Sequence, residues 1–405
     1  MKLLHTADWH LGKRLGDYSR LTEQAEVLDE ICEIAETEAV DAVLIAGDLF
    51  DTYNPPNEAL ELFYRTVHRL SNNGARAVVA IAGNHDSPDR VEAPDPLART
   101  CGIFFVGRPD SVVSSVSTNV GITTLNTAPG FVELQLPNCP DPLRLILTPY
   151  ASETTLKRFL GDDHRDQSLR EALRQDWQRR ANQHCDARGV NVLMAHLYFQ
   201  QRHGPAPEEP DDEKPILHVG GASAVFTEDI PPQVQYAALG HLHRYHTVAS
   251  APCPVCYSSS PLAYSFSEAD QQKQVVIVEV SAGSAARVRP VALRAGRRLC
   301  RPRFTEVEAA IRWLEDHPNT FVELTLVADS FLDSKLKRAL YAAHDGIVSI
   351  IPEVSTSEDA LVAPSIDLSK DLRSLFVDYF RARRGQEPND ALLTLFDEVL
   401  GTESS

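Results

Sequence analysis

The sequence predicts an α/β protein built around a mostly parallel β-sheet. Three segments, 2–10, 40–51 and 75–86, each begin with an apolar run of strand length and end in polar residues. The stretches between them repeat apolar residues at helical spacing, from Leu21 to Ala35 and from Leu60 to Leu70. Strands that alternate with helices form βαβ units, in which a crossover helix joins neighbouring parallel strands.

Each predicted helix has its own sequence signal. In the first, the apolar side chains are Leu21, Ala25, Leu28, Cys32 and Ala35, which fall on one helical face. The second follows "NPPN", where two prolines and an asparagine are typical of a helix start. Two further apolar runs, 190–199 and 234–245, predict additional buried strands of the same kind.

Polar groups stand at the carboxyl ends of these five predicted strands, where ligands bind in open α/β sheets. In chain order they are Asp8, His10, Asp48, Asp51, Asn84, His85, Asp86, His196, His241 and His243. Any one of them alone is more often a cap or a hydrogen-bonded core group than a ligand. Burying so many at one sheet edge is costly unless they pair or bind metal.

The residue types indicate which metals would fit. Carboxylate, imidazole and amide donors without sulfur suit Mn²⁺, Fe or Zn²⁺. The set is large enough for two ions if one carboxylate bridges them. Two ions about 3.5–4 Å apart can stabilise both the attacking and the leaving oxygen of a phosphoryl displacement.

The remainder of the chain predicts further units. Residues 103–150 are expected to form antiparallel strands, 153–185 a charged helix, and 204–215 a surface loop, and the β pattern continues to about residue 282. Residues 300–355 predict the order helix, strand, helix, strand. After a linker come two amphipathic helices, 369–383 and 390–400, whose apolar faces could fold back on the core or bind another protein.

Composition sets bounds on these expectations. A chain of 405 residues is long enough for two or three domains. Its net charge of −18, from 39 basic and 57 acidic residues, argues against unaided tight binding of nucleic acid. DNA stays possible as a substrate, because metal ions and a basic partner can supply positive charge. The N-terminus lacks the apolar run of a signal peptide, so a cytoplasmic protein is expected.

Seven cysteines are scattered along the chain, which is typical of reduced structural thiols. Only Cys253 and Cys256, in "CPVC", have metal-ligand spacing. A zinc site would need two more ligands, and no second CxxC exists. A loop or hairpin that carries two thiols is therefore preferred over a zinc site.

The order DxH, GDxxD, GNHD, H and GHxH resembles the calcineurin-like metallophosphoesterase superfamily. The spellings "LHTADWHLG", "VDAVLIAGDLFD", "AGNHDS", "ALGHLHR" and "SPLAYSF" look like its SbcD branch of bacterial nuclease subunits. The resemblance implies a two-sheet αββα metallophosphoesterase sandwich over 1–282, a smaller α+β capping domain over 283–355, and a helical hairpin for partner binding in 356–405. One departure is Ser259, which stands where the family often has glycine in "YSGSP".

The resemblance also implies a role for each residue. One metal ion, most often Mn²⁺ in this branch, would be held by Asp8, His10, Asp48 and His243, and a second by Asp48, Asn84, His196 and His241. His85 would face the scissile phosphate and either stabilise charge or protonate the leaving oxygen. The Asp51 carboxylate would pair with His85, orient it and stabilise its protonated form. The alternative for Asp51 is a turn-capping aspartate.

Partners follow from the same resemblance. The chain would work as a homodimer with an SbcC-type coiled-coil ATPase, bound through the tail helices at about 369–400, and would cleave DNA in repair and recombination as exonuclease and endonuclease. A metallophosphatase or phosphodiesterase acting on a small molecule or phosphoprotein would share every ligand. A non-catalytic scaffold on this fold should have lost ligands, and none is missing.

Overall fold

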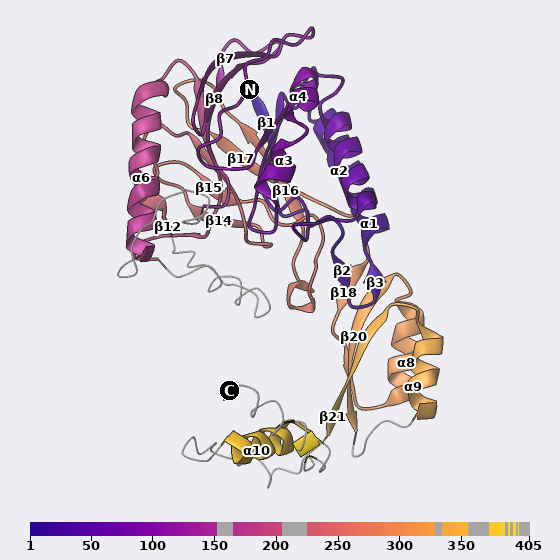
Figure 1. Ribbon diagram of the computed structural model, residues 1–405. Helices are drawn as coiled ribbons and strands as arrows, with labels where there is room; N and C mark the ends of the chain where they lie inside the picture. Colours follow the sequence, from indigo (N-terminus) through magenta and orange to yellow (C-terminus); the bar gives the residue numbers. More distant parts are fainter. Residues whose placement is uncertain are drawn as a thin grey trace.

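A computed structural model describes residues 1–151, 165–204, 225–328, 334–354 and 372–384, together with 388, 392, 393 and 396. Two β-sheets lie face to face, and helices cover their outer faces (Figure 1). A smaller unit of strands and helices is attached below, at the side of the first two helices. The predicted two-sheet αββα sandwich is thereby confirmed.

The first sheet has six strands in the order β17-β16-β1-β4-β5-β6. Four are parallel: β1 (Lys2–Thr6), β4 (Ala42–Ala46), β5 (Ala77–Ile81) and β6 (Ile103–Val106). The other two, β16 (Gln274–Glu279) and β17 (Arg287–Ala292), are antiparallel, with β16 paired to β1. This sheet therefore extends past residue 282, where the sequence predicts the end of the first domain.

The second sheet has seven strands, in the order β14-β15-β13-β10-β9-β8-β7. Its parallel centre consists of β15 (Val255–Tyr257), β13 (Tyr236–Gly240), β10 (Val190–His196) and β9 (Leu143–Thr148). Antiparallel strands complete it: β14 (His246–Ala249) at one side, β8 (Phe131–Gln135) and β7 (Thr123–Ala128) at the other.

The expectation of antiparallel strands over 103–150 is correct for β7 and β8, holds for β9 only on the side that faces β8, and is wrong for β6. β6 pairs in parallel with β5, so it extends the first sheet. A short apolar run such as "IFFV" carries no directional signal. Its orientation is set by the connection before it, which contains α3 (Pro88–Glu92), α4 (Asp95–Ala98) and the 3₁₀ turn η1 (Arg99–Cys101).

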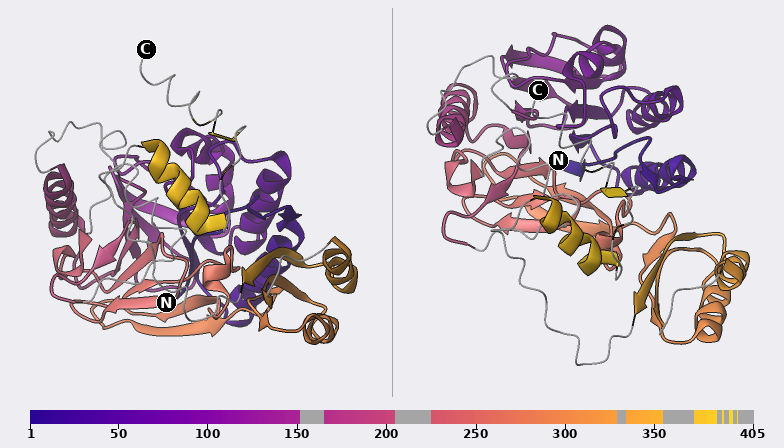
Figure 2. Two further views of the ribbon diagram at one scale, coloured as in Figure 1. Left: turned by 90° about the horizontal axis from the view of Figure 1, so that it is seen from below. Right: turned by 60° about the horizontal axis from the view of Figure 1, so that its bottom comes forward.

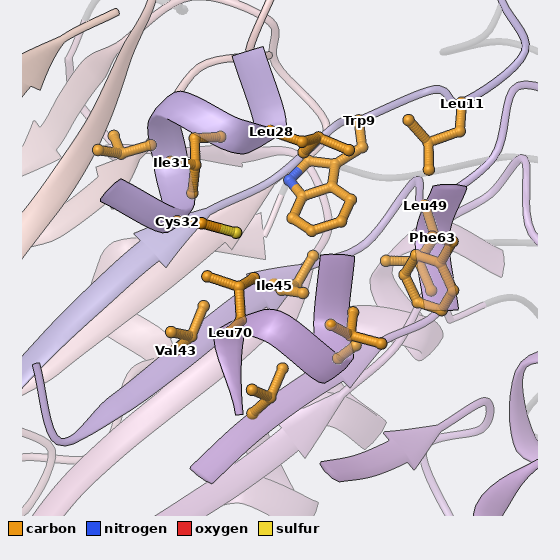
Figure 3. Packing of buried hydrophobic residues seen from close by; sticks show 14 of the residues in the cluster. Trp9, Leu11, Leu28, Ile31, Cys32, Val43, Ile45, Leu49, Phe63 and Leu70 are labelled. Carbon is orange, nitrogen blue, oxygen red and sulfur yellow. The ribbon is translucent and has the colours of Figure 1, made fainter. Parts of the chain in front are cut away.

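The outer helices pack against the outer faces of the two sheets. α1 (Leu21–Thr37) and α2 (Asn57–Leu70) cover the first sheet, and α6 (Arg165–His184) covers the second. The predicted helices of these regions are confirmed. Figure 3 shows the first of these cores, where Trp9 packs with Leu28 and Ile31 of α1, and Phe63 of α2 lies beside Leu49. Trp9 and Leu49 flank predicted ligands, so this core also fixes the loops that carry them.

The core between the sheets is apolar apart from a few polar side chains, and one of these, His5, joins the two sheets. From β1 its Nδ1 lies 2.8 Å from the hydroxyl of Tyr236, and its Nε2 lies 3.1 Å from the carbonyl of Leu239, both on β13. Burial lowers the pKa of His5 to about 3, so the ring is neutral in the folded protein.

The smaller unit consists of β18 (Arg298–Cys300), β19 (Arg303–Phe304), α8 (Val307–Asp316), β20 (Thr320–Ala328), α9 (Ser334–Ala343) and β21 (Ile347–Val354). The predicted order of helix, strand, helix and strand is confirmed. The smaller unit contacts a short hairpin of β2 (Arg14–Leu15) and β3 (Tyr18–Ser19). In this contact the Tyr18 hydroxyl donates to the carbonyls of Asp345 and Ile347.

Minor elements complete the described chain: β11 (Phe199–Gln200), β12 (Val225–Phe226), and the 3₁₀ turns η2 (Thr227–Asp229) and η3 (Phe266–Glu268). Helix α10 (Leu372–Arg384) corresponds to the first predicted tail helix and lies apart from the sandwich in Figure 1. Figure 2 shows the same helix from below. The second tail helix and the loop at 204–215 fall largely outside the described residues. Among those residues, no helix is both long and apolar enough to cross a bilayer.

Stability should fall on mild acidification because of His5. Its folded pKa is lowered, so unfolding takes up a proton at pH values between about 3 and 6.5. The stabilising effect is complete above pH 6.5 and is lost as the pH falls toward 3. Between pH 7 and pH 5, we expect His5 to contribute a loss of about 2 kcal/mol in the free energy of unfolding. Urea unfolding of wild type and His5→Gln at both pH values measures this loss of stability. An equal loss in the two proteins would contradict the attribution of the loss to His5.

Candidate active site

All the predicted site residues lie at one edge of the sandwich, where the carboxyl ends of both parallel sheets meet. Asp8 and His10 follow β1, Asp48 follows β4, and Asn84 follows β5. The second sheet brings in a further three, His196 at the end of β10 and His241 and His243 after β13. The structure therefore brings together side chains that are more than 230 positions apart in sequence.

The first group gathers around two facing imidazoles. Nε2 of His10 and Nε2 of His243 are 2.9 Å apart, and both rings are buried. The carboxylate of Asp8 belongs to the same group, since ligand atoms of Asp8, His10 and His243 all lie within 4.8 Å of one another. These are three of the four residues predicted for the first ion.

The second group gathers around the side-chain amide of Asn84. Its Oδ1 lies 2.9 Å from Nε2 of His196 and 3.1 Å from Nδ1 of His241. The other ring nitrogen of His196 lies 2.9 Å from the carbonyl of Ala46, which orients the ring. These are three of the four residues predicted for the second ion.

Asp48 lies between the two groups. One of its carboxylate oxygens, Oδ2, is 3.5 Å from Nε2 of His10 and 3.4 Å from Nε2 of His196. The other, Oδ1, accepts a 2.9 Å hydrogen bond from the main-chain N–H of His85. A single carboxylate therefore faces both groups, as a bridging ligand would.

Glycines make room for this convergence. A Cβ on Gly47 would lie 2.2 Å from Nδ1 of His196, one on Gly240 would lie 1.9 Å from the carbonyl oxygen of Ala46, and one on Gly83 would lie 2.1 Å from Oδ1 of Asp48. Each of these glycines directly precedes a predicted ligand, in "GD", "GN" and "GH". The glycine is needed because a group from another strand occupies the space of its side chain.

The backbone of the site is strained. Positive φ angles occur at four predicted ligands, namely Asp8 (56°), His10 (44°), Asp48 (49°) and His241 (113°). Non-glycine residues seldom adopt such angles, and clusters of them are typical of functional sites. Ser259, at the position where the family often has glycine, also has a positive φ of 88°. A glycine there would adopt this angle without strain, which explains the family preference.

Burial acts on the ionisable groups unequally. It raises the pKa of Asp8 to about 7, while His196 and His10 hold the pKa of Asp48 well below its usual range despite burial. Burial lowers the pKa of His10 well below 6.5 and that of His241 to about 3, whereas Asp48 raises the pKa of His196 to about 9 against the effect of burial. So many buried carboxylates and imidazoles at one sheet edge are stable only when they are paired with opposite charges, such as metal ions.

The residues fit divalent metal ions. The donors are carboxylate oxygens, an amide oxygen and imidazole nitrogens, which suit Mn²⁺, Fe or Zn²⁺. Oδ2 of Asp8 is buried and makes no hydrogen bond to any described residue, so an electron pair is available for a cation. Only one proton fits between two imidazole nitrogens 2.9 Å apart, and a metal ion would satisfy both nitrogens.

His85 and Asp51 lie beside the first group, and their contact runs through the main chain. Nδ1 of His85 lies 2.8 Å from the carbonyl oxygen of Asp51. The Asp51 carboxylate instead forms a 3.0 Å ion pair with Lys13 and lies 3.7 Å from Nδ1 of His10. The resemblance implies that the Asp51 carboxylate pairs with His85, whereas in the structure the main-chain carbonyl of Asp51 makes this hydrogen bond.

Asp86 has a role that its sequence position does not specify. Its carboxylate accepts hydrogen bonds from the main-chain N–H groups of Leu49, Phe50 and Gly83, at 2.8–3.0 Å. It therefore ties the loop after β4 to the loop after β5. Burial raises its pKa to about 6, while these hydrogen bonds oppose the rise.

Cys253 and Cys256 are buried free thiols, with Cys256 on β15. The candidate metal groups found among the described residues all lie at the sheet edge and include neither thiol. Burial raises the pKa of Cys253 to about 12, so it stays protonated as a core residue would.

The fold and this site define a class. The family model of the calcineurin-like phosphoesterases matches residues 1–245, which include every predicted ligand. A solved dimetal phosphatase from Danio rerio aligns over 71% of this chain and 98% of its own at 12% identity, with a TM-score of 0.39, which is too low to support any argument.

Within that class, the similarity extends along the whole chain. The SbcD subunit of the SbcCD nuclease from Bacillus subtilis is 35% identical over 98% of this chain and 97% of its own length. The protein of the same name from Escherichia coli K12 is 31% identical over 70% of this chain and 66% of its own. The chain therefore belongs to the SbcD nuclease subunits of the calcineurin-like phosphoesterases, and it is a metal-dependent phosphodiesterase.

The glycine argument makes a direct prediction for Gly83. In Gly83→Ala, the new methyl group would displace the Asp48 carboxylate, because the two would be only 2.1 Å apart. We expect loss of at least one of the two predicted ions, by metal analysis of the dialysed protein, together with loss of phosphodiesterase activity. Near-ultraviolet circular dichroism checks that the protein is folded, and a folded variant with unchanged metal content would contradict the prediction.

Proposed function

We propose that this nuclease subunit is a Mn²⁺-dependent DNA exonuclease and endonuclease that acts with an SbcC-type ATPase. The observation that carries the proposal is the position of Asp48, whose one carboxylate oxygen faces a histidine of each group. Such an arrangement suits two ions that share a ligand, and two-ion sites are well suited to phosphodiester hydrolysis. The oxygen and nitrogen donors favour Mn²⁺ over softer metals.

We assign the donors to two ions. Asp8, His10, Asp48 and His243 would hold the first ion, and Asp48, Asn84, His196 and His241 the second. When bound, the ions activate water as the nucleophile and offset the charge that develops on the phosphate. The chain contributes a rigid donor set, since Asp86 and the three glycines fix the loops on which the donors stand.

His85 would act on the leaving oxygen. Because a carbonyl can only accept a hydrogen bond, Nδ1 of His85 donates to Asp51. In the doubly protonated ring, Nε2 would carry the second proton and give it to the leaving oxygen, after which the ring is neutral. The 3′ or 5′ oxygen of a deoxyribose is a poor leaving group, and general-acid help of this kind is typically about 10²- to 10⁴-fold. Asp51 would thus orient His85 through its main chain.

The other parts of the chain would supply access and partners. We propose that the unit over 298–354 is a capping domain that shapes DNA access, since β17 before it belongs to the first sheet. We also propose that the tail at about 369–400 binds the base of the ATPase coiled coil. A homodimer bound to the ATPase would carry the basic surface that a chain of net charge −18 lacks. The seven free thiols suit the reducing cytoplasm. There the nuclease would act in DNA repair and recombination.

A metallophosphatase acting on a small molecule or phosphoprotein would use the same donors. The acidic charge favours it, while the smaller unit over 298–354 and the similarity to SbcD subunits along 98% of the chain favour the nuclease.

One experiment separates these two functions. The full chain is incubated with Mn²⁺ and either a linear DNA duplex or a mononucleotide diester, with and without an SbcC-type ATPase. We expect duplex degradation that increases when the ATPase is present. Cleavage of the diester alone, under both conditions, would contradict the proposed nuclease function.

Substitution of His85 and of Asp48 should affect metal binding differently. His85→Ala removes the proton donor but no donor to the ions, so we expect it to bind metal as wild type does and to lose most nuclease turnover, by about 10²-fold or more. Asp48→Ala should lose both metal and activity. Metal analysis beside a nuclease assay measures both, and a lower metal content in His85→Ala would assign His85 to the ligands instead.

A further inference from the structure

The two facing histidines of the first group share a second feature, on the ring nitrogens that point away from each other. Nδ1 of His10 lies 3.7 Å from the carboxylate of Asp51, and Nδ1 of His243 lies 3.5 Å from Oε1 of Glu268. A carboxylate behind a ligating imidazole keeps the proton on the far nitrogen, which leaves the near nitrogen free for metal. Each histidine of the first group therefore has a carboxylate behind it.

The two carboxylates differ in burial. The Asp51 side chain is 26% exposed and pairs with Lys13, which is 27% exposed. The Glu268 side chain is fully buried, and its partner Lys273 is 8% exposed. A buried ion pair is poor evidence for stability, because removing both charges from water offsets most of their attraction. Its presence against a metal-site histidine calls for another explanation.

Lys273 extends the contact from the ring to the main chain of His243. Its ammonium donates to the carbonyl of His243 at 2.8 Å, to the hydroxyl of Ser260 at 3.0 Å and to the side chain of Gln271 at 3.1 Å, in addition to Glu268. The pair thus holds His243 at two points, its ring through Glu268 and its backbone through Lys273.

The segment that carries Glu268 is itself rigid. Oε1 of Glu268 accepts from the main-chain N–H of Tyr264 at 3.2 Å, and the hydroxyl of Tyr264 donates to the carbonyl of Trp9, between Asp8 and His10. On its other side, Phe266 and Ala269 pack with Leu299 and Phe321 of the smaller unit.

We propose that Glu268 and Lys273 are positioning residues for the first metal ion, which act by fixing the ring and backbone of His243. This inference rests on the proposed two-ion function and deepens it. Among the described residues, the printed contacts of Glu268 and Lys273 reach His243 of the first group and no member of the second, so their effect should be confined to one of the two ions. Removal of a residue behind a ligand typically costs about 10- to 100-fold in metal affinity.

The test replaces the pair together, as Glu268→Leu with Lys273→Met, so that no unpaired charge stays buried. Isothermal titration calorimetry with Mn²⁺ on the full chain gives the number and affinity of the ions. We expect one ion to bind as in wild type and the other about 10- to 100-fold more weakly. The control is Glu133→Leu with Arg144→Met, a partly buried ion pair on β8 and β9 with an N–O distance of 2.7 Å. Arg144 also pairs with the partly exposed Asp186, and the double change should leave both metal affinities unchanged.

Wild-type affinity for both ions in the folded double variant would overturn the inference, and so would an equal loss at both ions. If the double variant does not fold, Glu268→Gln keeps the side-chain volume and an acceptor oxygen, and it should still weaken one ion several-fold; no change there would overturn the inference equally. Failure of the proposed two-ion function can be distinguished from failure of this inference, because in the first case wild type itself would bind fewer than two ions.

Discussion

The position of the Asp48 carboxylate is the constraint on which the rest of the structure depends. It stands after β4 in the first sheet, yet it contacts His10 from β1, the main chain of His85 after β5, and His196 from the second sheet. Such contacts need two parallel sheets that end at the same level. The core between the sheets, with His5 bonded to β13, holds them at that level. The fold is therefore a means of bringing separate strand ends to one carboxylate.

This convergence has a cost in backbone and charge. Four predicted ligands adopt positive φ angles, and two aspartates and several histidines are buried side by side. Each left-handed non-glycine residue costs on the order of 1–3 kcal/mol. The apolar cores on both faces of each sheet supply the stability that offsets it, and metal binding would add more. The site is consequently built for a bound cation rather than for the stability of the chain.

The sequence alone predicts much of the site, because ligands of this kind follow apolar strands at fixed short spacings. Asp8, His10, Asp48, Asn84 and the later histidines are all expected at one sheet edge, and the structure brings them there. The direction of β6 is not predictable from "IFFV", since parallel and antiparallel edge strands have the same composition. The main-chain contact between Asp51 and His85 is equally hidden, because a backbone carbonyl has no sequence signature.

Glu268 is a residue whose place in the site cannot be predicted from the sequence. In the sequence it is one glutamate in a polar stretch, 25 positions after His243, and nothing in that spacing marks it as a partner. Only the fold shows that it is buried against the ring. Polar groups beyond the ligands are set by tertiary packing, so their identification needs coordinates.

Anomalous X-ray diffraction from crystals of the full chain with Mn²⁺ tests the central claim most directly. The account predicts two manganese peaks with Asp48 between them, one beside His10 and His243 and the other beside Asn84, His196 and His241. A single peak, or two peaks that do not share Asp48, would contradict it.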